Sequence, residues 1–196
     1  MKIGLYFGSF NPIHTGHLII ATHIINNTDL NEVWFVVSPQ NPFKQSAGLL
    51  NQQHRLSLVK IAIEGEPKLK ASNAEFKLPK PSYTIETLIY LKEKYGKHDF
   101  SVIMGSDSYQ NLHKWKNYEQ IINNYHIYIY LRPHFPVPEN QPENIIILSA
   151  PLIEISSTQI RKYIKESKSI RYMVPDGVLQ EIKAMHYYRS SMENPA

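Results

Sequence analysis

The stretch KIGLYFGSFNPIHTGHLIIATHIINN, residues 2–27, decides the fold of this chain of 196 residues. Residues 2–7 form an apolar run typical of a strand, and residues 17–27 have the pattern of a helix. Between them lies GSFNPIHTGH, with two glycines, a turn-forming Asn11–Pro12 pair and two histidines. A strand that leads through a glycine-containing turn into a helix is the first half of a βαβ unit. The stretch therefore predicts a parallel sheet with a functional turn at the carboxyl end of a strand.

The same alternation continues along the chain. Further strands are predicted at 32–38, 69–76, 99–105, 126–132 and 144–149. Helices are predicted at 52–65, at 82–96 with Ser82 as its N-cap and Gly96 at its end, at 156–167 and at 175–185. This order predicts an α/β fold, a Rossmann-like doubly wound parallel sheet with right-handed crossovers and a C-terminal helical segment.

The predicted organisation is a single domain over residues 1–189, with a tail at 190–196. Its C-terminal part, 155–189, is helical. The proline-rich stretch 132–144 is expected to be a loose loop. Residues 46–53 are a second loop candidate and a candidate lid.

Composition excludes several classes of protein. The chain has no cysteine, so disulfides and thiolate chemistry are excluded. Its net charge is +4, but the sequence has no basic run of the kind that binds nucleic acid. No apolar run approaches the roughly 20 residues of a membrane span, and the N-terminus lacks a signal-peptide pattern. We expect a cytoplasmic protein without nucleic-acid or membrane partners, and a homo-oligomer is compatible with the sequence.

The residues of the opening stretch suit phosphate binding. Gly8 and Gly16 permit a tight turn and close approach of the backbone to a ligand. His17 falls in the first turn of the predicted helix, where unpaired N–H groups and the helix dipole favour anions, and His14 precedes that turn. Two imidazoles at such a place can donate to phosphate oxygens, and an adjacent phosphate should raise their pKa values.

A second candidate motif follows the last predicted strand, at ISSTQIRK, residues 155–162. Ser156, Ser157 and Thr158 are good N-cap residues, and Arg161 lies one turn later on the same side of the helix. A helix start with hydroxyl groups and an arginine can hold a triphosphate. Because both motifs follow strands of a parallel sheet, we expect them to meet at one edge.

The two motifs resemble the (T/H)xGH and ISSTxIR signatures of the nucleotidyltransferase superfamily. Other segments are similar to the nicotinate-nucleotide adenylyltransferase family: NPFK (41–44), SYTIETL (82–88), MGSDS (104–108), Trp115, LRP (131–133) and RYMVPDGVLQEI (171–182). Family members often have aspartate where this chain has Asn11. The resemblance implies transfer of AMP from ATP to nicotinate mononucleotide, giving deamido-NAD and pyrophosphate, as a step of NAD biosynthesis.

The resemblance also implies roles for individual residues. The catalytic residues would be His17, which stabilises charge on the α-phosphate, together with His14 and Arg161. The residues implied to bind ATP are Gly8, Ser9, Phe10, His14, His17, Gly105, Asp107, Arg132, Ser157, Thr158 and Arg161. Those implied to bind the acceptor are Asn41, Lys44, Arg55, Ser82, Tyr83, Thr84 and Trp115. Mg²⁺ is expected on the ATP phosphates, with no metal site built by protein side chains.

The sequence leaves other functions open. Phosphopantetheine adenylyltransferase shares the fold and mechanism but does not predict the SYTIETL and RYMVPDGV matches. A nicotinamide-mononucleotide-preferring adenylyltransferase is a second alternative. A catalytically inactive nucleotide-binding regulator is a third, and the presence of both histidines and Arg161 argues against it. A tRNA synthetase fragment would share the histidine signature, but this chain lacks a KMSKS-like loop.

Overall fold

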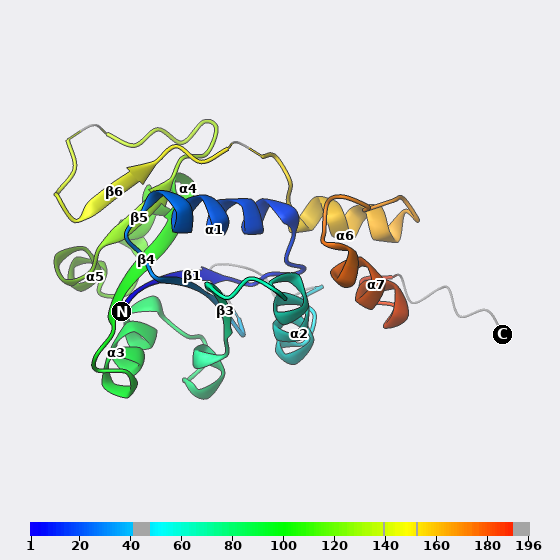
Figure 1. Ribbon diagram of the computed structural model, residues 1–196, viewed down its shortest axis with the longest axis horizontal. Coiled ribbons are helices and arrows are strands. Elements are labelled where there is room, and N and C mark those ends of the chain that lie inside the picture. Colours follow the sequence, from blue (N-terminus) through cyan, green and yellow to red (C-terminus); the bar gives the residue numbers. More distant parts are fainter. Residues whose placement is uncertain (41–47, 139, 152, 190–196) are drawn as a thin grey trace.

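Strand β1 (Lys2–Gly8) lies in the middle of six parallel strands arranged in the order β3-β2-β1-β4-β5-β6 (Figure 1). The computed structural model describes residues 1–40, 48–138, 140–151 and 153–189. Strand β1 pairs with β2 on one side and with β4 on the other. The chain thus builds one half of the sheet, crosses back and builds the other half. The predicted doubly wound parallel sheet is confirmed.

The elements follow the predicted alternation of strands and helices. The remaining strands are β2 (Glu32–Val37), β3 (Leu69–Ser72), β4 (Asp99–Gly105), β5 (Ile127–Tyr130) and β6 (Ile145–Leu148). The helices are α1 (Thr15–Asn27), α2 (Gln52–Ala62), α3 (Thr84–Lys94), α4 (Ser106–Tyr109), α5 (Tyr118–Asn124), α6 (Ser157–Lys165) and α7 (Asp176–Ala184). The 3₁₀ turns are η1 (Ala74–Lys77) and η2 (Leu112–Lys114).

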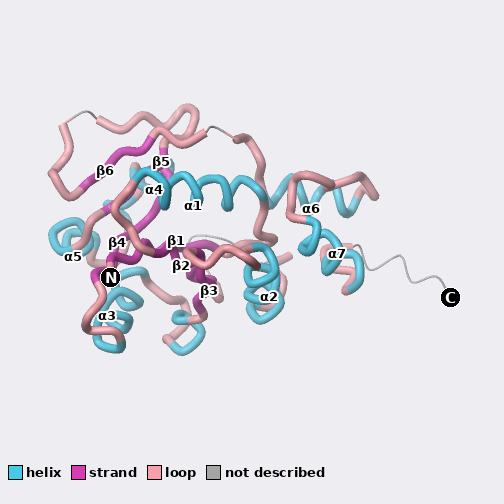
Figure 2. The backbone as a smooth tube through the Cα atoms, in the orientation of Figure 1, coloured by secondary structure: helices cyan, strands magenta, loops and turns pink. Residues whose placement is uncertain are grey.

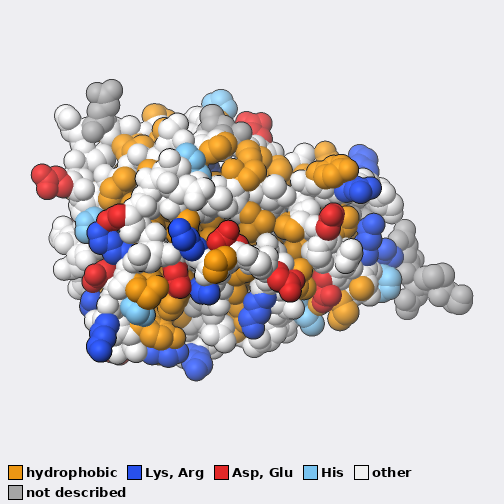
Figure 3. Space-filling model, viewed as in Figure 1, with side chains coloured by type: hydrophobic (Ala, Val, Ile, Leu, Met, Phe, Trp, Pro, Cys, Tyr) orange, Lys and Arg blue, Asp and Glu red, His pale blue; other side chains and the backbone are white. Residues whose placement is uncertain are grey.

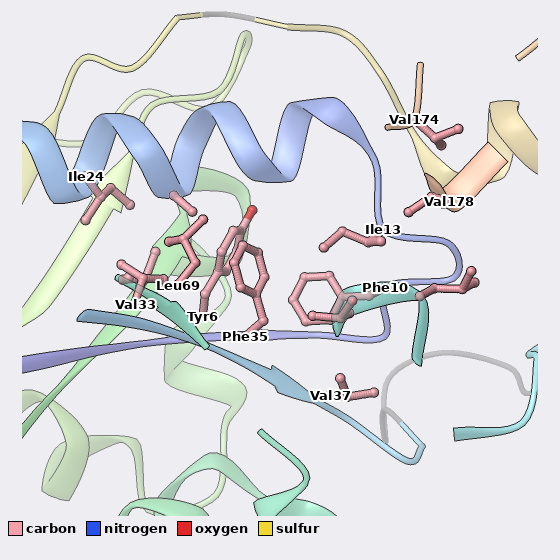
Figure 4. Close-up of a cluster of buried hydrophobic side chains, with 14 of the residues drawn as sticks. Tyr6, Phe10, Ile13, Ile24, Val33, Phe35, Val37, Leu69, Val174 and Val178 are labelled. Carbon is pink, nitrogen blue, oxygen red and sulfur yellow. The ribbon is translucent and has the colours of Figure 1, made fainter. Parts of the chain in front are cut away.

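Helices cover both faces of the sheet, as Figure 2 shows. Side chains of α1, α2, α6 and α7 belong to one buried cluster, to which β1 contributes Tyr6. Figure 4 shows this cluster beneath α1, with Tyr6, Phe10 and Phe35 facing one another. Side chains of α3 and α5 belong to the second cluster, to which β1 contributes Ile3 and Leu5. Because successive strand residues point to opposite faces, both faces of β1 are buried, as parallel sheets require.

Two local predictions differ from the structure, and two short helices were not predicted. The strand predicted at 69–76 ends at Ser72, and a 3₁₀ turn follows. Helix α3 begins at Thr84 with Tyr83 as its N-cap, so Ser82 does not cap it. The Ser82 hydroxyl donates instead to Glu75, which lies in η1. The short helices α4 and α5 were not predicted, because neither is long enough to show a helical period.

The C-terminal helical segment is present as α6 and α7, which lie beside the start of α1 in Figure 1. Within the described ranges, no helix has the length and apolar character needed to span a membrane. The face seen in Figure 3 carries Lys and Arg side chains interspersed with Asp and Glu. Charge on that face is therefore mixed rather than gathered in a basic patch.

Candidate active site

A cleft of about 660 Å³ opens beyond the carboxyl ends of β1 and β4. These two strands flank the point where the strand order reverses, which is where ligands bind in doubly wound sheets. Of the residues predicted for the site, those that line the cleft are Gly8, Ser9, Phe10, His14, His17, Ser82, Tyr83, Thr84, Gly105, Asp107, Trp115, Arg132, Ser157, Thr158 and Arg161. The structure thus brings together most of both predicted halves of the site.

The loop after β1 is shaped by Gly8 and Phe10. Phe10 is buried and has a φ of 44°, in the left-handed region. Its ring packs edge-on against His17, with 5.1 Å between ring centroids. A Cβ at Gly8 would lie 2.8 Å from the Phe10 ring, so only glycine leaves room for that ring. The loop backbone is therefore held toward the cleft by aromatic packing beneath it.

The two histidines lie against each other at the start of α1. Their rings stack with 3.7 Å between centroids. The backbone N–H of His14 donates to Nδ1 of His17 at 3.3 Å. A neutral His17 that accepts at Nδ1 carries its proton on Nε2, so this bond fixes the tautomer in which Nε2 is a donor.

Burial controls the protonation of His14 in the protein without phosphate. Burial lowers the pKa of His14 to about 4, and the positive charge of Arg132 adds to that effect. His14 is 6% exposed, and the raised pKa predicted for it applies to a ring with a phosphate beside it. The ligand-free protein therefore holds a neutral His14 at physiological pH.

The lowered pKa makes stability depend on pH. The unfolded chain, with an ordinary pKa of 6.5, binds a proton before the folded protein does as pH falls. Stability contributed by neutral His14 is complete above that value and is lost as pH falls toward about 4, by up to about 3 kcal/mol. Urea unfolding of the wild type and His14→Gln at about pH 7.5 and about pH 4.5 tests this. We expect the wild type to lose more stability than the variant, and equal losses would contradict the assignment.

Two hydrogen bonds join the signature motifs. Arg161 donates from Nη1 to the carbonyl of Asn11 at 2.7 Å. Ser157 donates from Oγ to the carbonyl of Pro12 at 2.9 Å. Because these carbonyls belong to the loop after β1, the start of α6 is fixed against that loop. The predicted meeting of the two motifs at one edge is confirmed.

The segment before α7 supports the start of α1. The backbone N–H of Thr15 donates to the carbonyl of Met173 at 2.9 Å. The Thr15 hydroxyl donates to the carbonyl of Tyr172 at 3.3 Å. An otherwise unpaired N–H at the helix start is satisfied in this way, while the histidines remain at the cleft.

A chain of polar contacts lies on the β4 and β5 side of the cleft. Arg132 Nε lies 3.2 Å from Asp107 Oδ1, and its Nη2 donates to the Tyr130 hydroxyl at 3.1 Å. The hydroxyls of Tyr6 and Tyr130 are 3.2 Å apart. A Cβ at Gly105 would collide with the Asp107 carboxylate and lie 2.9 Å from Arg132 Nε. Glycine at this position thus permits the pair to sit at the strand end.

The acceptor half of the predicted site lies around the start of α3. Ser82, Tyr83 and Thr84 line the cleft there, and Trp115 lines it from beyond η2. Lys116 donates to Glu86 at 2.6 Å and lies 4.7 Å from the centre of the Tyr83 ring. These contacts tie the Trp115 segment to the first turn of α3.

Arg55 occupies a different place from the one predicted. It is fully buried on α2 and is not among the cleft-lining residues. Its guanidinium donates to four backbone carbonyls, those of Ser9, Ser38, Pro39 and Leu50. Burial lowers the pKa of Arg55 to about 10, so it stays charged at neutral pH. It holds the loops after β1 and β2 instead of facing a ligand.

Replacing Arg55 by methionine should destabilise the fold. The apolar part of the side chain is kept, but four backbone carbonyls, all bonded to the buried guanidinium, lose their donor, and we expect a loss of at least about 3 kcal/mol. Lys60→Met, at an exposed position of the same helix, is the matched control and should change stability by less than about 0.5 kcal/mol. Chemical denaturation measures both. Equal effects of the two substitutions would show that the buried bonds contribute little.

Asn41 and Lys44, predicted at the acceptor, lie outside the described residues.

Asn11 was predicted only as a turn former. Its side-chain amide donates to the carbonyl of Gly48 at 3.0 Å, and its side-chain oxygen accepts from the N–H of Leu50 at 3.1 Å. An ionised aspartate could not donate, so the amide suits this chain. Glu75 also lines the cleft but was not predicted as a site residue, because no sequence pattern distinguishes it from other glutamates.

Comparisons with known proteins agree with this geometry. A family model described as cytidylyltransferase-like matches residues 5–163. The probable nicotinate-nucleotide adenylyltransferase of Flavobacterium psychrophilum is 50% identical over 192 residues, which cover 96% of this chain and 100% of that protein. The protein of the same name from Cytophaga hutchinsonii is 50% identical over 189 residues, covering 96% and 98%.

Solved structures show the same fold. The Plasmodium falciparum nicotinic acid mononucleotide adenylyltransferase complexed with NaAD matches with a TM-score of 0.81 and 22% identity, covering 95% of this chain and 97% of that one. The structure described as a putative nicotinate-nucleotide adenylyltransferase from Vibrio parahaemolyticus matches with a TM-score of 0.73 and 20% identity, covering 97% of each chain.

Proposed function

The chain belongs to the nicotinate-nucleotide adenylyltransferase family, and from this premise we propose that it joins ATP and nicotinate mononucleotide to give deamido-NAD and pyrophosphate. The observation that carries the proposal is the contact between the two signature motifs. Arg161 and Ser157 on α6 bond to the loop that presents His14 and His17. One cleft therefore offers cationic and hydroxyl donors around a single phosphate chain.

The reaction needs positioning and charge stabilisation more than proton transfer. A phosphate oxygen of nicotinate mononucleotide forms a bond to the α-phosphorus of ATP, and the bond from that phosphorus to the bridging oxygen breaks. The attacking oxygen is already anionic near neutral pH, so no general base is required. Donors fixed before the reaction can stabilise charge on the α-phosphate and on the leaving pyrophosphate.

We assign the donors by their places in the cleft. Nε2 of His17, at the N-terminus of α1, is suited to the α-phosphate oxygens, where the helix dipole adds to the attraction. Ser157, Thr158 and Arg161 suit the β- and γ-phosphates. His14, next to His17, supplies a second imidazole to the same phosphates.

ATP enters as a magnesium complex in this proposal. In the described parts of the chain, there is no group of three or more His, Cys, Asp or Glu arranged to hold a metal ion. Mg²⁺ prefers phosphate oxygens and water, and when bound it neutralises charge on the triphosphate. We therefore treat the ion as part of the substrate.

The remaining lining residues suit the two nucleosides. The carboxylate of Asp107 can accept from a ribose hydroxyl of ATP, and Arg132 holds that carboxylate in place. On the other side, Trp115 can stack on the nicotinate ring. The N-terminus of α3, at Tyr83 and Thr84, can receive the ring carboxylate.

An acceptor panel tests the proposal. Purified protein is given MgATP with nicotinate mononucleotide, nicotinamide mononucleotide or phosphopantetheine, and dinucleotide and pyrophosphate are quantified. We expect turnover with nicotinate mononucleotide at a kcat/KM above those of the other two. Preferred turnover of phosphopantetheine or of the amide would replace the proposed acceptor. Absence of turnover with every acceptor would favour a nucleotide-binding regulator.

A further inference from the structure

Glu75 is a buried carboxylate that the proposed mechanism does not use. It lies in η1 and is 2% exposed, and among the described residues no other Asp or Glu is buried. It also lines the cleft, on the acceptor side. A carboxylate at this depth is costly unless donors satisfy it, so the neighbouring donors indicate what it does.

The carboxylate is satisfied by hydroxyl groups. Ser82 donates to Oε2 at 2.7 Å, and Thr87 donates to Oε1 at 3.1 Å. Burial raises the pKa of Glu75, while hydrogen bonds from Ser82, Ser38 and Thr87 oppose that rise. Each carboxylate oxygen thus has its own partner, and the two partners lie on either side of the start of α3.

The bonds fix the backbone segment between those partners. Tyr83 and Thr84 lie between Ser82 and Thr87 and line the cleft. The Thr87 hydroxyl also lies 3.3 Å from the carbonyl of Tyr83. Tyr83 is the N-cap and gives no side-chain acceptor to the helix, and its carbonyl accepts from the N–H of Glu86 at 3.0 Å. The N–H groups of Thr84 and Ile85 have no acceptor among the described residues and can serve another one. Glu75 therefore holds a set of backbone donors in one orientation at the cleft wall.

We propose that Glu75 is a positioning residue that determines selectivity for an acceptor bearing a carboxylate. The inference rests on the proposed function, because it concerns how the acceptor is recognised. Fixed N–H donors match the two oxygens of a carboxylate, whereas an amide offers one oxygen and would turn its own N–H groups toward the same donors. Loosening the segment should therefore weaken binding of the acid more than binding of the amide.

The test compares three variants with the wild type. Glu75→Gln keeps the shape of the side chain but not its ability to accept from both hydroxyls. Thr87→Val keeps the volume at a buried position and removes one partner. Glu93→Gln, at an exposed position near the other end of α3, is the matched control. KM and kcat are measured for nicotinate mononucleotide, nicotinamide mononucleotide and MgATP, and melting temperatures report folding.

We expect Glu75→Gln to raise the KM for nicotinate mononucleotide about tenfold, with the KM for MgATP and kcat changed less than about twofold. The KM for the amide should change less than about threefold, so selectivity falls. Thr87→Val should act in the same direction, and it carries the test if Glu75→Gln melts at a much lower temperature.

Three results would overturn the inference. An unchanged KM for nicotinate mononucleotide in both variants would mean that Glu75 does not fix the donors that bind the acid. A lower KM in both would mean that the charge of Glu75 only repels the acid. Equal losses for acid, amide and ATP would mean general damage to the fold. The wild type and Glu93→Gln report separately on the proposed function: if neither makes deamido-NAD, that function fails, and if both do, only the role of Glu75 is at issue.

Discussion

Replacing His17 by alanine is expected to lower kcat by about a thousandfold while the protein stays folded. The side chain lies at the N-terminus of α1, and its tautomer is fixed by the N–H of His14. A hydrogen-bond donor that is already in position does not have to reorient when charge develops on the α-phosphate, so no free energy is spent on reorganisation. Its removal should therefore affect kcat far more than the KM for ATP.

His23→Ala is the matched control for this prediction. His23 lies on the same helix, away from the cleft-lining residues. Steady-state kinetics with MgATP and nicotinate mononucleotide should show near-normal turnover for it, and calorimetry should show that both variants melt cooperatively. A His17→Ala enzyme that retains most of its kcat would contradict the mechanism.

Replacing Arg161 by alanine should lower kcat/KM for ATP by about a thousandfold. Two contributions combine in this residue. The guanidinium is proposed to hold the leaving phosphates, and it donates to the Asn11 carbonyl, which fixes the loop that carries the histidines. Loss of that bond should displace the loop, so both kcat and the KM for ATP should change.

Two further variants separate these contributions. Arg161→Lys keeps the charge but not the paired donors, and we expect it to recover only part of the activity. Lys162→Ala changes the neighbouring exposed residue of α6 and should leave the kinetics unchanged. Full activity of Arg161→Lys would show that charge alone suffices, and full activity of Arg161→Ala would remove the residue from the site.

Most of the fold could be predicted from sequence because its strands are short apolar runs separated by helical patterns. Both faces of β1 are buried along most of its length, so residues 3–7 form an uninterrupted apolar stretch. The meeting of the loop that carries His14 and His17 with Arg161 could be predicted for a related reason. Each motif lies in the chain after a strand, and strands of a parallel sheet end at a common edge.

The parts that sequence did not reveal depend on backbone partners and distant contacts. In the described part of the chain, the guanidinium of Arg55 donates to carbonyl oxygens, which every residue possesses, so no side-chain pattern distinguishes it from a ligand-binding arginine. Ser82 was predicted as a helix cap because serine favours that position, but Glu75 competes for its hydroxyl. Such a competition is decided only once η1 and α3 are packed together.

The bond between Arg161 and Asn11 also has a consequence for when the enzyme becomes active. The two residues are 150 positions apart in the chain. During synthesis the whole sheet and both histidines leave the ribosome before α6 does, and contacts of such long range form late. A nascent or truncated chain that ends before Ser157 would hold the histidine loop without its partner. Under the proposed mechanism, catalytic competence would thus follow the emergence of α6 and not the completion of the sheet.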